Sequence, residues 1–264
     1  MKVGWMMDYG LPVAGFILQC RAYEAVKPDW VELVKCHPSK RPPRDIEAFI
    51  LHGDLYPRCW IEVLEGKPLM AHRHGGWHGG DPVFRRWILD NADLLTFNSP
   101  KQKELFRYGI GVRTAFVPTP IDVDRFQAAA AKSEKREGMM YLGLLAPVKG
   151  IPHTVDWAMC HGHEINFYGK GLYPTSHQAI VPPCKWHGAV PYEEVPDLLA
   201  RYKTFVFMPY DGDLYSRTVI EAYAAGCELI LDGDLKAFYD YVDLEQCRRG
   251  GEIFWERFEE VVHA

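Results

Sequence analysis

The sequence contains no long hydrophobic run. None of its apolar stretches approaches the roughly 18–20 residues that a membrane-spanning helix needs. The N-terminus also lacks the basic segment and apolar core of a secretion signal. These two absences argue against an integral membrane protein and predict a cytoplasmic one.

Paired cysteines are lacking as well. The seven cysteines are odd in number and scattered, and no two of them form a CxxC pair. A disulfide framework would need an even, regularly spaced set, so the pattern favours reduced thiols in a cytoplasm.

The sequence also lacks an excess of basic residues. The chain has 30 Lys and Arg against 35 Asp and Glu. Residues 1–127 hold 17 basic against 15 acidic residues, and the remainder holds 13 against 20. This balance is unlike the footprint of a dedicated nucleic-acid binder. The uneven halves indicate two units with different partners, or chance variation in surface charge.

The apolar residues that are present form a repeating pattern. A chain of 264 residues with 48% hydrophobic residues can build one large or two compact domains. Short apolar runs alternate with helical patterns, which is typical of an α/β fold with mostly parallel sheets. The predicted strands are 2–6, 30–34, 48–51, 68–71, 94–98, 114–117, 139–142, 165–168, 204–208 and 229–231, and the predicted helices are 82–91, 100–108, 151–159, 192–202 and 217–225.

Two series of these elements are separated by a proline-rich and charged segment. We expect a linker near residues 120–137, between an N-terminal domain over 1–125 and a C-terminal domain over 138–245. The last stretch, 246–264, ends in the amphipathic FWERFEEVVHA and predicts a packing helix that crosses back to the first domain. Open α/β sheets bind ligands at the carboxyl ends of their strands, so two such domains would form a binding cleft.

Two loops of the second series carry glycines after strands. In YLGLLAPVKGIPH, Lys149 and Gly150 precede a helix, where backbone amides and a lysine suit a phosphate. The other interpretation is a solvated lysine and a turn glycine. In NFYGKG, Gly169 and Gly171 either let a ligand approach the backbone or form a tight turn.

The segment DLYSRTVIEAYAAG places one carboxylate, Glu221, among apolar neighbours on a helix for which Ser216 is a suitable N-cap. A buried and unpaired carboxylate is costly, so Glu221 should reach solvent, a partner or a ligand such as a sugar hydroxyl. The alternative is a salt bridge to Arg217, four residues earlier, at the helix surface.

The order of these pieces resembles the retaining GT-B glycosyltransferases of the family 4 type. The resemblance runs through SPKQKELFRYGI and FVPTPIDVDRF, the lysine loop, the GxG strand end, WHGAVPYEEVPDLLARY and a D/E-x7-E helix ending in AAG. It covers roughly residues 65–232. It implies two Rossmann-like, doubly wound domains facing a cleft, with a reduced N-terminal domain.

The resemblance also implies roles for residues of the second domain. Lys149 would hold the donor diphosphate and Glu221 the nucleotide ribose, beside Gly169 and Gly171. Asp213 stands where the family has a glutamate for the transferred sugar. The amides of Ser216, Arg217 and Thr218 would help to bind the phosphates. Leu144 replaces the family's usual arginine, and Arg217 is our candidate to substitute for it.

In the first domain, KPLMAHRHGGWHGG gathers histidines. His72, His74 and His78 suggest a zinc site, but no nearby cysteine or carboxylate other than Asp81 completes the ligand set. The resemblance instead implies that His74 faces the cleft near the donor sugar, and a plain turn histidine is a third interpretation. By the same resemblance Gly10, in MDYGLPVAG, lets the chain approach the donor phosphate.

Two DxD strings, at 211–213 and 232–234, suggest a metal-dependent transferase of another fold. Both follow strands of a second Rossmann-like unit, which argues against that reading. We expect no essential metal, and no cofactor besides the nucleotide-sugar co-substrate.

Together these features predict a hexosyltransferase that retains anomeric configuration. UDP-glucose is the first candidate donor and GDP-mannose the second. The acceptor would be a glycan, a small molecule or a modified DNA base. The alternatives are a nucleotide-sugar epimerase on the same fold, a non-catalytic nucleotide-sugar-binding subunit, and a DNA-binding protein without transfer.

Overall fold

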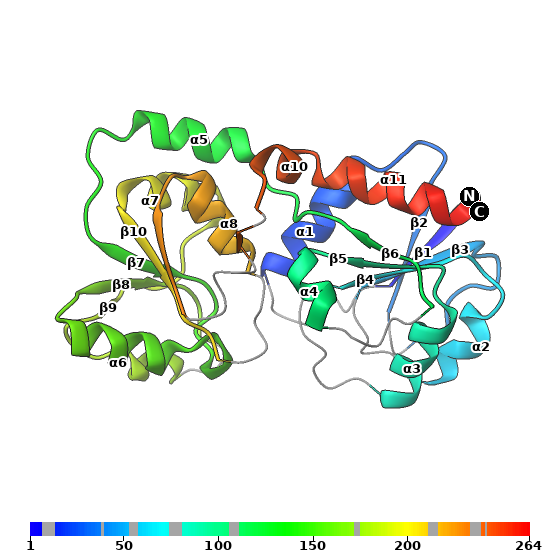
Figure 1. Ribbon diagram of the computed structural model, residues 1–264, viewed down its shortest axis with the longest axis horizontal. Coiled ribbons are helices and arrows are strands. Elements are labelled where there is room, and N and C mark those ends of the chain that lie inside the picture. Colours follow the sequence, from blue (N-terminus) through cyan, green and yellow to red (C-terminus); the bar gives the residue numbers. More distant parts are fainter. Residues whose placement is uncertain are drawn as a thin grey trace. The chain divides into compact units, whose positions relative to one another are not determined.

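The chain folds into two compact units (Figure 1). Our computed structural model describes residues 1–6, 14–37, 40–52, 58–73, 81–105, 111–171, 175–210, 216–232, 239–240 and 242–264. Unit 1 comprises Met1–Pro120 and Arg249–Ala264, and unit 2 comprises Ile121–Arg248. The chain therefore passes between the units twice.

Unit 1 is built on a six-stranded parallel sheet. The strand order is β2-β1-β3-β4-β5-β6: β2 lies on one side of β1 and all later strands lie on the other, so the order of strands reverses between β1 and β3. Its strands are β1 (Lys2–Met6), β2 (Glu32–Cys36), β3 (Ala48–His52), β4 (Leu69–Arg73), β5 (Leu94–Phe97) and β6 (Thr114–Phe116). Its helices are α1 (Ala14–Ala25), α2 (Ile61–Leu64), α3 (Pro82–Asn91), α4 (Pro100–Leu105) and α11 (Gly250–Val262), with a 3-10 turn at Arg58–Trp60.

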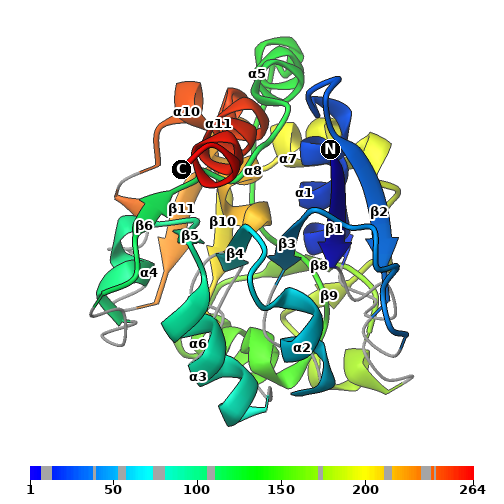
Figure 2. The same ribbon diagram turned by 90° about the vertical axis from the view of Figure 1, so that its right-hand side faces the viewer.

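Alternation along the strands produces a separate core on each face of this sheet. Val3 and Trp5 of β1 pack with α1 and α11, whereas Met6 packs on the opposite face with α2 and α3 (Figure 2). β2 begins two residues later than its pattern predicts. The carbonyl of Pro28 accepts a hydrogen bond from the amide of Val31 (3.1 Å), which turns the chain just before the strand.

The C-terminal segment forms α11, and its apolar stripe is buried within unit 1. Phe254, Trp255, Phe258 and Val261 belong to the same core as Trp5. The indole nitrogen of Trp255 also donates to the carbonyl oxygen of Tyr23 on α1 (2.8 Å).

Unit 2 is built on a five-stranded parallel sheet in the order β11-β10-β7-β8-β9. Its strands are β7 (Met139–Leu142), β8 (Ile165–Tyr168), β9 (Lys185–Trp186), β10 (Thr204–Phe207) and β11 (Glu228–Leu231). Its helices are α5 (Val123–Lys132), α6 (Ile151–His161), α7 (Val195–Arg201), α8 (Arg217–Ala224) and α10 (Leu244–Arg248), with 3-10 turns at Pro147–Lys149, Ser176–Ala179 and Tyr192–Glu194. The predicted α/β class with parallel sheets is confirmed.

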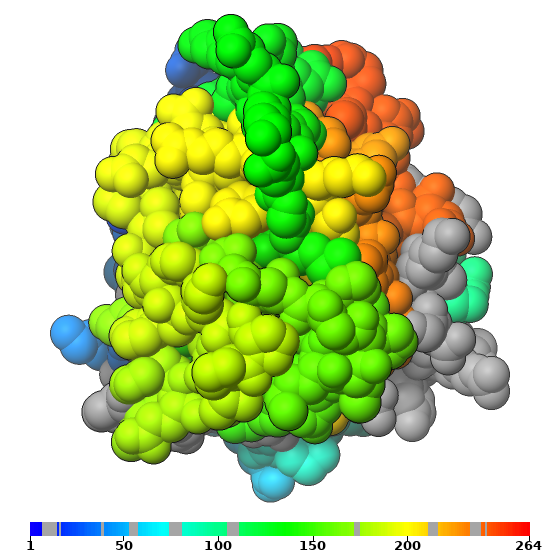
Figure 3. All heavy atoms as spheres, turned by 90° about the vertical axis from the view of Figure 1, so that its left-hand side faces the viewer, coloured from blue at the N-terminus to red at the C-terminus, as the bar shows by residue number. Residues whose placement is uncertain are grey.

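The segment 120–137, for which the sequence suggests a linker, contains α5 and belongs to unit 2 from Ile121 onward. The carboxylate of Asp122 caps this helix by accepting from the amide of Arg125 (3.2 Å). Its apolar face buries Val123, Phe126 and Ala129, which explains why the segment folds as a helix. α5 packs on α7. Figure 3 views this unit nearly along the helix, and the green chain that follows α5 runs down its surface between yellow atoms.

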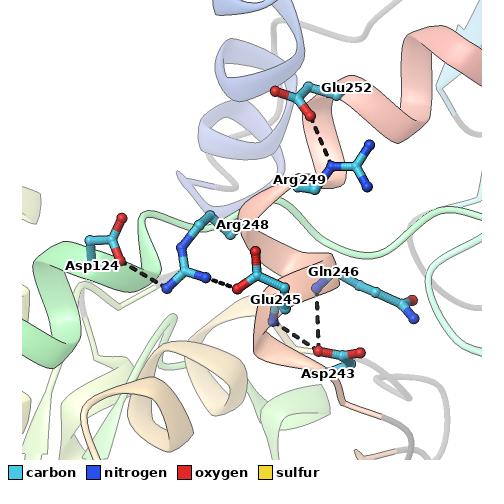
Figure 4. A network of polar contacts seen from close by, with 7 residues as sticks. All are labelled: Asp124, Asp243, Glu245, Gln246, Arg248, Arg249 and Glu252. Carbon is cyan, nitrogen blue, oxygen red and sulfur yellow. Dashed lines mark hydrogen bonds and ion pairs between the residues drawn. The ribbon is translucent and has the colours of Figure 1, made fainter.

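The two passages of the chain begin beside each other in unit 2. The amide of Ile121 donates to the carbonyl of Cys247 (3.3 Å). Arg248 contacts Asp124 of α5 (2.8 Å) and Glu245 of α10, and the next residue, Arg249, bonds Glu252 within unit 1 (Figure 4). These ion pairs are exposed to solvent, so each contributes little to stability.

Candidate functional site

Successive strands of the parallel unit 2 sheet are added first on one side of β7 and then on the other, so the order of strands reverses between β7 and β10. Strands β8 and β9 lie to one side of β7, and β10 and β11 lie to the other. The loops that leave the carboxyl ends of β7 and β10 therefore diverge, which is where open α/β sheets bind ligands. The first of these loops carries Lys149, and the second leads into α8.

The lysine loop rests directly on the end of β10. Gly150 has φ +67°, and a Cβ atom at this position would lie 1.8 Å from the carbonyl oxygen of Met208. The amide of Tyr210 donates to the carbonyl of Val148 (3.2 Å). Only glycine allows this approach, so Gly150 fixes half-buried Lys149 at the reversal point.

The glycines after β8 serve a close contact between two loops. Gly169 has φ +149°, and a Cβ atom there would lie 1.8 Å from the carbonyl oxygen of Gly143 in the lysine loop. Gly171 pairs with Leu145 in an isolated parallel bridge. The tight-turn interpretation therefore suffices to explain Gly169, and the pairing brings both loops to one edge of the sheet.

The first turn of α8 is held by a tyrosine from a later segment. Ser216 occupies the N-cap position with extended backbone, as predicted, and its amide donates to the hydroxyl of Tyr239 (2.7 Å). Its own hydroxyl lies 2.9 Å from that of Thr218 and does not cap the helix.

Glu221 is buried on α8 and paired. Its carboxylate oxygen Oε1 accepts from Nε of Arg217 (2.7 Å) and from the hydroxyl of Tyr192 (3.0 Å). The side chains of Arg217 and Glu221 are only 8% and 2% exposed. The salt bridge given above as the alternative interpretation is present, but not at the helix surface. It lies inside the unit because most of the surrounding α8 residues are buried apolar ones. Removing one partner of such a pair typically costs about 3–5 kcal/mol.

This pairing bears on the idea that Arg217 replaces the arginine missing at Leu144. Nε of Arg217 is engaged by Glu221, and Nη2 donates to the hydroxyl of Tyr192 (2.9 Å). Burial by itself lowers the pKa of Arg217, but Glu221 and Tyr192 more than offset this and raise it. Binding a diphosphate through Nε would require breaking a buried ion pair.

Three of the predicted site residues, Gly10, His74 and Asp213, lie outside the described residues. His78 lies outside them too. Within the described part of the chain, no group of three or more His, Cys, Asp or Glu side chains could hold a metal ion.

His72 takes part in a buried network within unit 1. Its Nδ1 lies 2.7 Å from the hydroxyl of Thr96, and its Nε2 lies 3.1 Å from that of Tyr23 and 3.4 Å from Nε2 of Gln19. His52 is its register partner on β3, with ring centroids 5.8 Å apart. Burial lowers the pKa of His52 to about 3 and also holds that of His72 well below its ordinary value.

Sequence reasoning missed His52 and Tyr192. The signal for His52 is a polar residue at the carboxyl end of the otherwise apolar strand AFILH. For Tyr192 the sequence gives no comparable signal, because its partner Glu221 is 29 residues away.

Two Rossmann-like units with parallel sheets constitute the fold of the GT-B glycosyltransferases. HepE from Anabaena in complex with UDP is similar over 100% of this chain and 98% of its own, with 14% identity and a TM-score of 0.64. AviGT4, a glycosyltransferase involved in avilamycin A biosynthesis, is similar over 100% and 98%, with 14% identity and a TM-score of 0.58. A glycosyltransferase from Rickettsia africae covers 99% and 94%, with 9% identity and a TM-score of 0.61.

The comparisons of sequence found no match. No protein-family model matches the chain, and no curated protein matches it. At the identities above, the structural likeness establishes the fold.

Among the helices of the described residues, none has the length and apolar character needed to cross a membrane.

Proposed function

We propose that this chain is a glycosyltransferase that moves a hexose from a nucleotide sugar to an acceptor hydroxyl. The observation that carries the proposal is the junction of β7 and β10. There the lysine loop, seated on Met208 through Gly150, shares one sheet edge with the start of α8, the helix of Glu221. The structures of HepE with UDP and with UDP-glucose, which have the same fold, support a nucleotide-sugar donor.

In this proposal different residues of unit 2 bind different parts of the donor. Lys149 and the amides at the start of α8, near Ser216 and Thr218, neutralise the charge that develops on the leaving diphosphate. Glu221 binds the ribose hydroxyls, since an ionised carboxylate accepts several hydrogen bonds. Gly169 and Gly171 shape the adjoining loop.

The remaining roles follow the family pattern described above. His74 positions the sugar, Asp213 contacts its hydroxyls, and Gly10 approaches the phosphate. Transfer proceeds with retention, without an essential metal. UDP-glucose is the first donor to test and GDP-mannose the second, with a glycan, a small molecule or a modified DNA base as acceptor.

A thermal-shift panel of UDP-glucose, GDP-mannose, UDP and GDP tests donor binding. A ligand at one hundred times its Kd stabilises the folded state by about 2.7 kcal/mol and raises the Tm measurably. Lys149→Ala should weaken binding of the best ligand about ten- to hundredfold, as expected for the loss of a charge-assisted hydrogen bond. Lys132→Ala, at an exposed position on α5, is the matched control and should bind as the wild type does. If no nucleotide shifts the Tm, the proposal is wrong.

The departures at Leu144 and Asp213 favour a second candidate, a subunit that binds the nucleotide sugar without transferring it. Incubation with the bound donor and a panel of acceptors separates the two functions. A transferase yields glycosylated product or slow hydrolysis, and a retaining one preserves the anomeric configuration in the product's NMR spectrum. The binding subunit returns the donor intact, whereas an epimerase converts it without an acceptor.

A further inference from the structure

Three side chains from two distant segments form one buried polar unit around Glu221. Arg217 lies one helical turn before Glu221 on α8, and Tyr192 comes from the 3-10 turn that precedes α7. Each of the three contacts the other two, at 2.7, 2.9 and 3.0 Å. A carboxylate that is 2% exposed needs such donors to remain buried.

The two hydrogen bonds to the Glu221 carboxylate involve only one of its oxygen atoms. Both donors reach the same carboxylate oxygen, Oε1. Within the described residues no group donates to Oε2. A carboxylate offers about four lone-pair sites, so this arrangement occupies one oxygen and leaves the other with acceptor capacity.

The ring of Tyr192 lies close to two guanidinium groups. The guanidinium carbons of Arg217 and of Arg125 on α5 each lie 5.8 Å from its centroid. Arg125 also donates to the carbonyl of Glu193 (2.6 Å), which anchors the turn. Burial, and then the charge of Glu221, raise the pKa of Tyr192 to about 12, so its hydroxyl remains a donor at neutral pH.

We propose that Tyr192 and Arg217 are positioning residues that hold Oε1 of Glu221 and reserve Oε2 for the ribose hydroxyls of a nucleoside diphosphate. This inference rests on the proposed function. It predicts that preference for a ribose over a sugar lacking both hydroxyls depends on a tyrosine that contacts no ligand. A merely structural role for Tyr192 would change stability and leave this preference unchanged.

The test compares the dissociation constants of UDP and 2′,3′-dideoxy-UDP by titration calorimetry. We expect the wild type to prefer UDP about ten- to hundredfold, as hydrogen bonds to a charged group allow. Glu221→Gln should lower this ratio at least several-fold. Tyr192→Phe keeps the ring and removes the hydroxyl, and should reduce the ratio about three- to tenfold while leaving the affinity for dideoxy-UDP within twofold of wild type.

Tyr202→Phe is the matched control. It removes another part-buried tyrosine hydroxyl of unit 2, one that lies 2.7 Å from the hydroxyl of Tyr168 and contacts neither Glu221 nor Arg217 in the described structure. Its ratio should equal that of the wild type. Arg217→Lys, which keeps the charge but loses the two-pronged geometry, should lower the ratio as Tyr192→Phe does.

The possible outcomes separate the inference from the function on which it rests. A wild-type ratio in Tyr192→Phe would overturn the positioning role and leave the donor site intact. A wild-type protein that binds UDP and dideoxy-UDP equally would overturn the ribose role of Glu221, and the inference with it, without removing nucleotide binding. Absence of UDP binding, together with no response to the other nucleotides of the thermal-shift panel, would overturn the proposed function itself.

Discussion

The two buried histidines of unit 1 predict that this unit loses stability in mild acid. His52 is 5% exposed and His72 is fully buried, on adjacent strands of the sheet. Burial lowers the pKa of His52 to about 3 and places that of His72 well below its ordinary value. Both rings therefore stay neutral in the folded state at pH 5, whereas the unfolded chain protonates them.

The sign and size follow from proton linkage. An unfolded histidine titrates near pH 6.5, so between about pH 6.5 and 3 the unfolded state binds a proton that the folded state does not. The free energy of unfolding therefore falls as the pH falls through this window. For one histidine the loss at pH 5 is about 2 kcal/mol, and for two it is about 4 kcal/mol. This is a large fraction of the 5–15 kcal/mol typical of a domain.

Hydrogen exchange resolved by peptide measures this effect in each unit separately. After correction for intrinsic exchange rates, peptides covering β3 and β4 should lose protection between pH 7.5 and pH 5, while those covering β7 and β10 should change much less. Carboxylates such as Asp81, whose pKa is lowered by a hydrogen bond from Arg58, contribute stability that is lost only below about pH 4. Their effect therefore lies below the interval from pH 7.5 to pH 5 that this measurement compares.

A variant assigns the effect to one ring. The ring of His52 lies among those of Trp5, Tyr23 and Phe254, with centroids 4.3, 6.3 and 5.9 Å away, and this aromatic site suits a phenyl group. His52→Phe should therefore reduce the pH slope by up to about 1.4 kcal/mol per pH unit. His161→Gln, at an exposed position of unit 2, should leave it unchanged. An unchanged slope in His52→Phe would refute the reasoning.

Three further predictions concern unit 2. Gly150→Ala should destabilise it by well over 1 kcal/mol in urea titration, because the new Cβ would meet Met208 as well as a positive φ. Gly162→Ala is the control, because Gly162 also has a positive φ (+68°) but an added Cβ would have no atom within 4 Å. This variant loses stability only through its backbone conformation, so equal losses in the two variants would contradict the clash with Met208. Arg217→Met should cost about 3–5 kcal/mol by leaving the buried carboxylate of Glu221 without a charged partner, and adding Glu221→Leu should recover part of this loss in a double-mutant cycle. Asp122→Ala should remove about 1 kcal/mol through the lost cap of α5, measured as a lower urea midpoint, and an unchanged midpoint would show that the cap contributes nothing.

The sequence by itself determined the class of fold and the position of most elements. Strands such as β3 and β7 are short apolar runs, and the helix of DLYSRTVIEAYAAG begins at the residue after its predicted cap, Ser216. These features are local, because strand alternation and helix capping depend on residues a few positions apart. The spacing of Arg217 and Glu221 was likewise enough to suggest their salt bridge.

The tertiary structure determined which residues from distant parts of the sequence are neighbours. Strand order brings the lysine loop onto the end of β10, and it pairs His52 with His72 across two strands. The fold also places Tyr192 in contact with Glu221, and the segment suggested to be a linker forms the helix α5. Such contacts join residues tens of positions apart, and whether Glu221 is exposed or buried depends on what covers the helix. The sequence showed that the carboxylate of Glu221 belongs to an apolar helix. The fold placed beside it the two hydrogen-bond donors, Arg217 and Tyr192, that stabilise it in the interior.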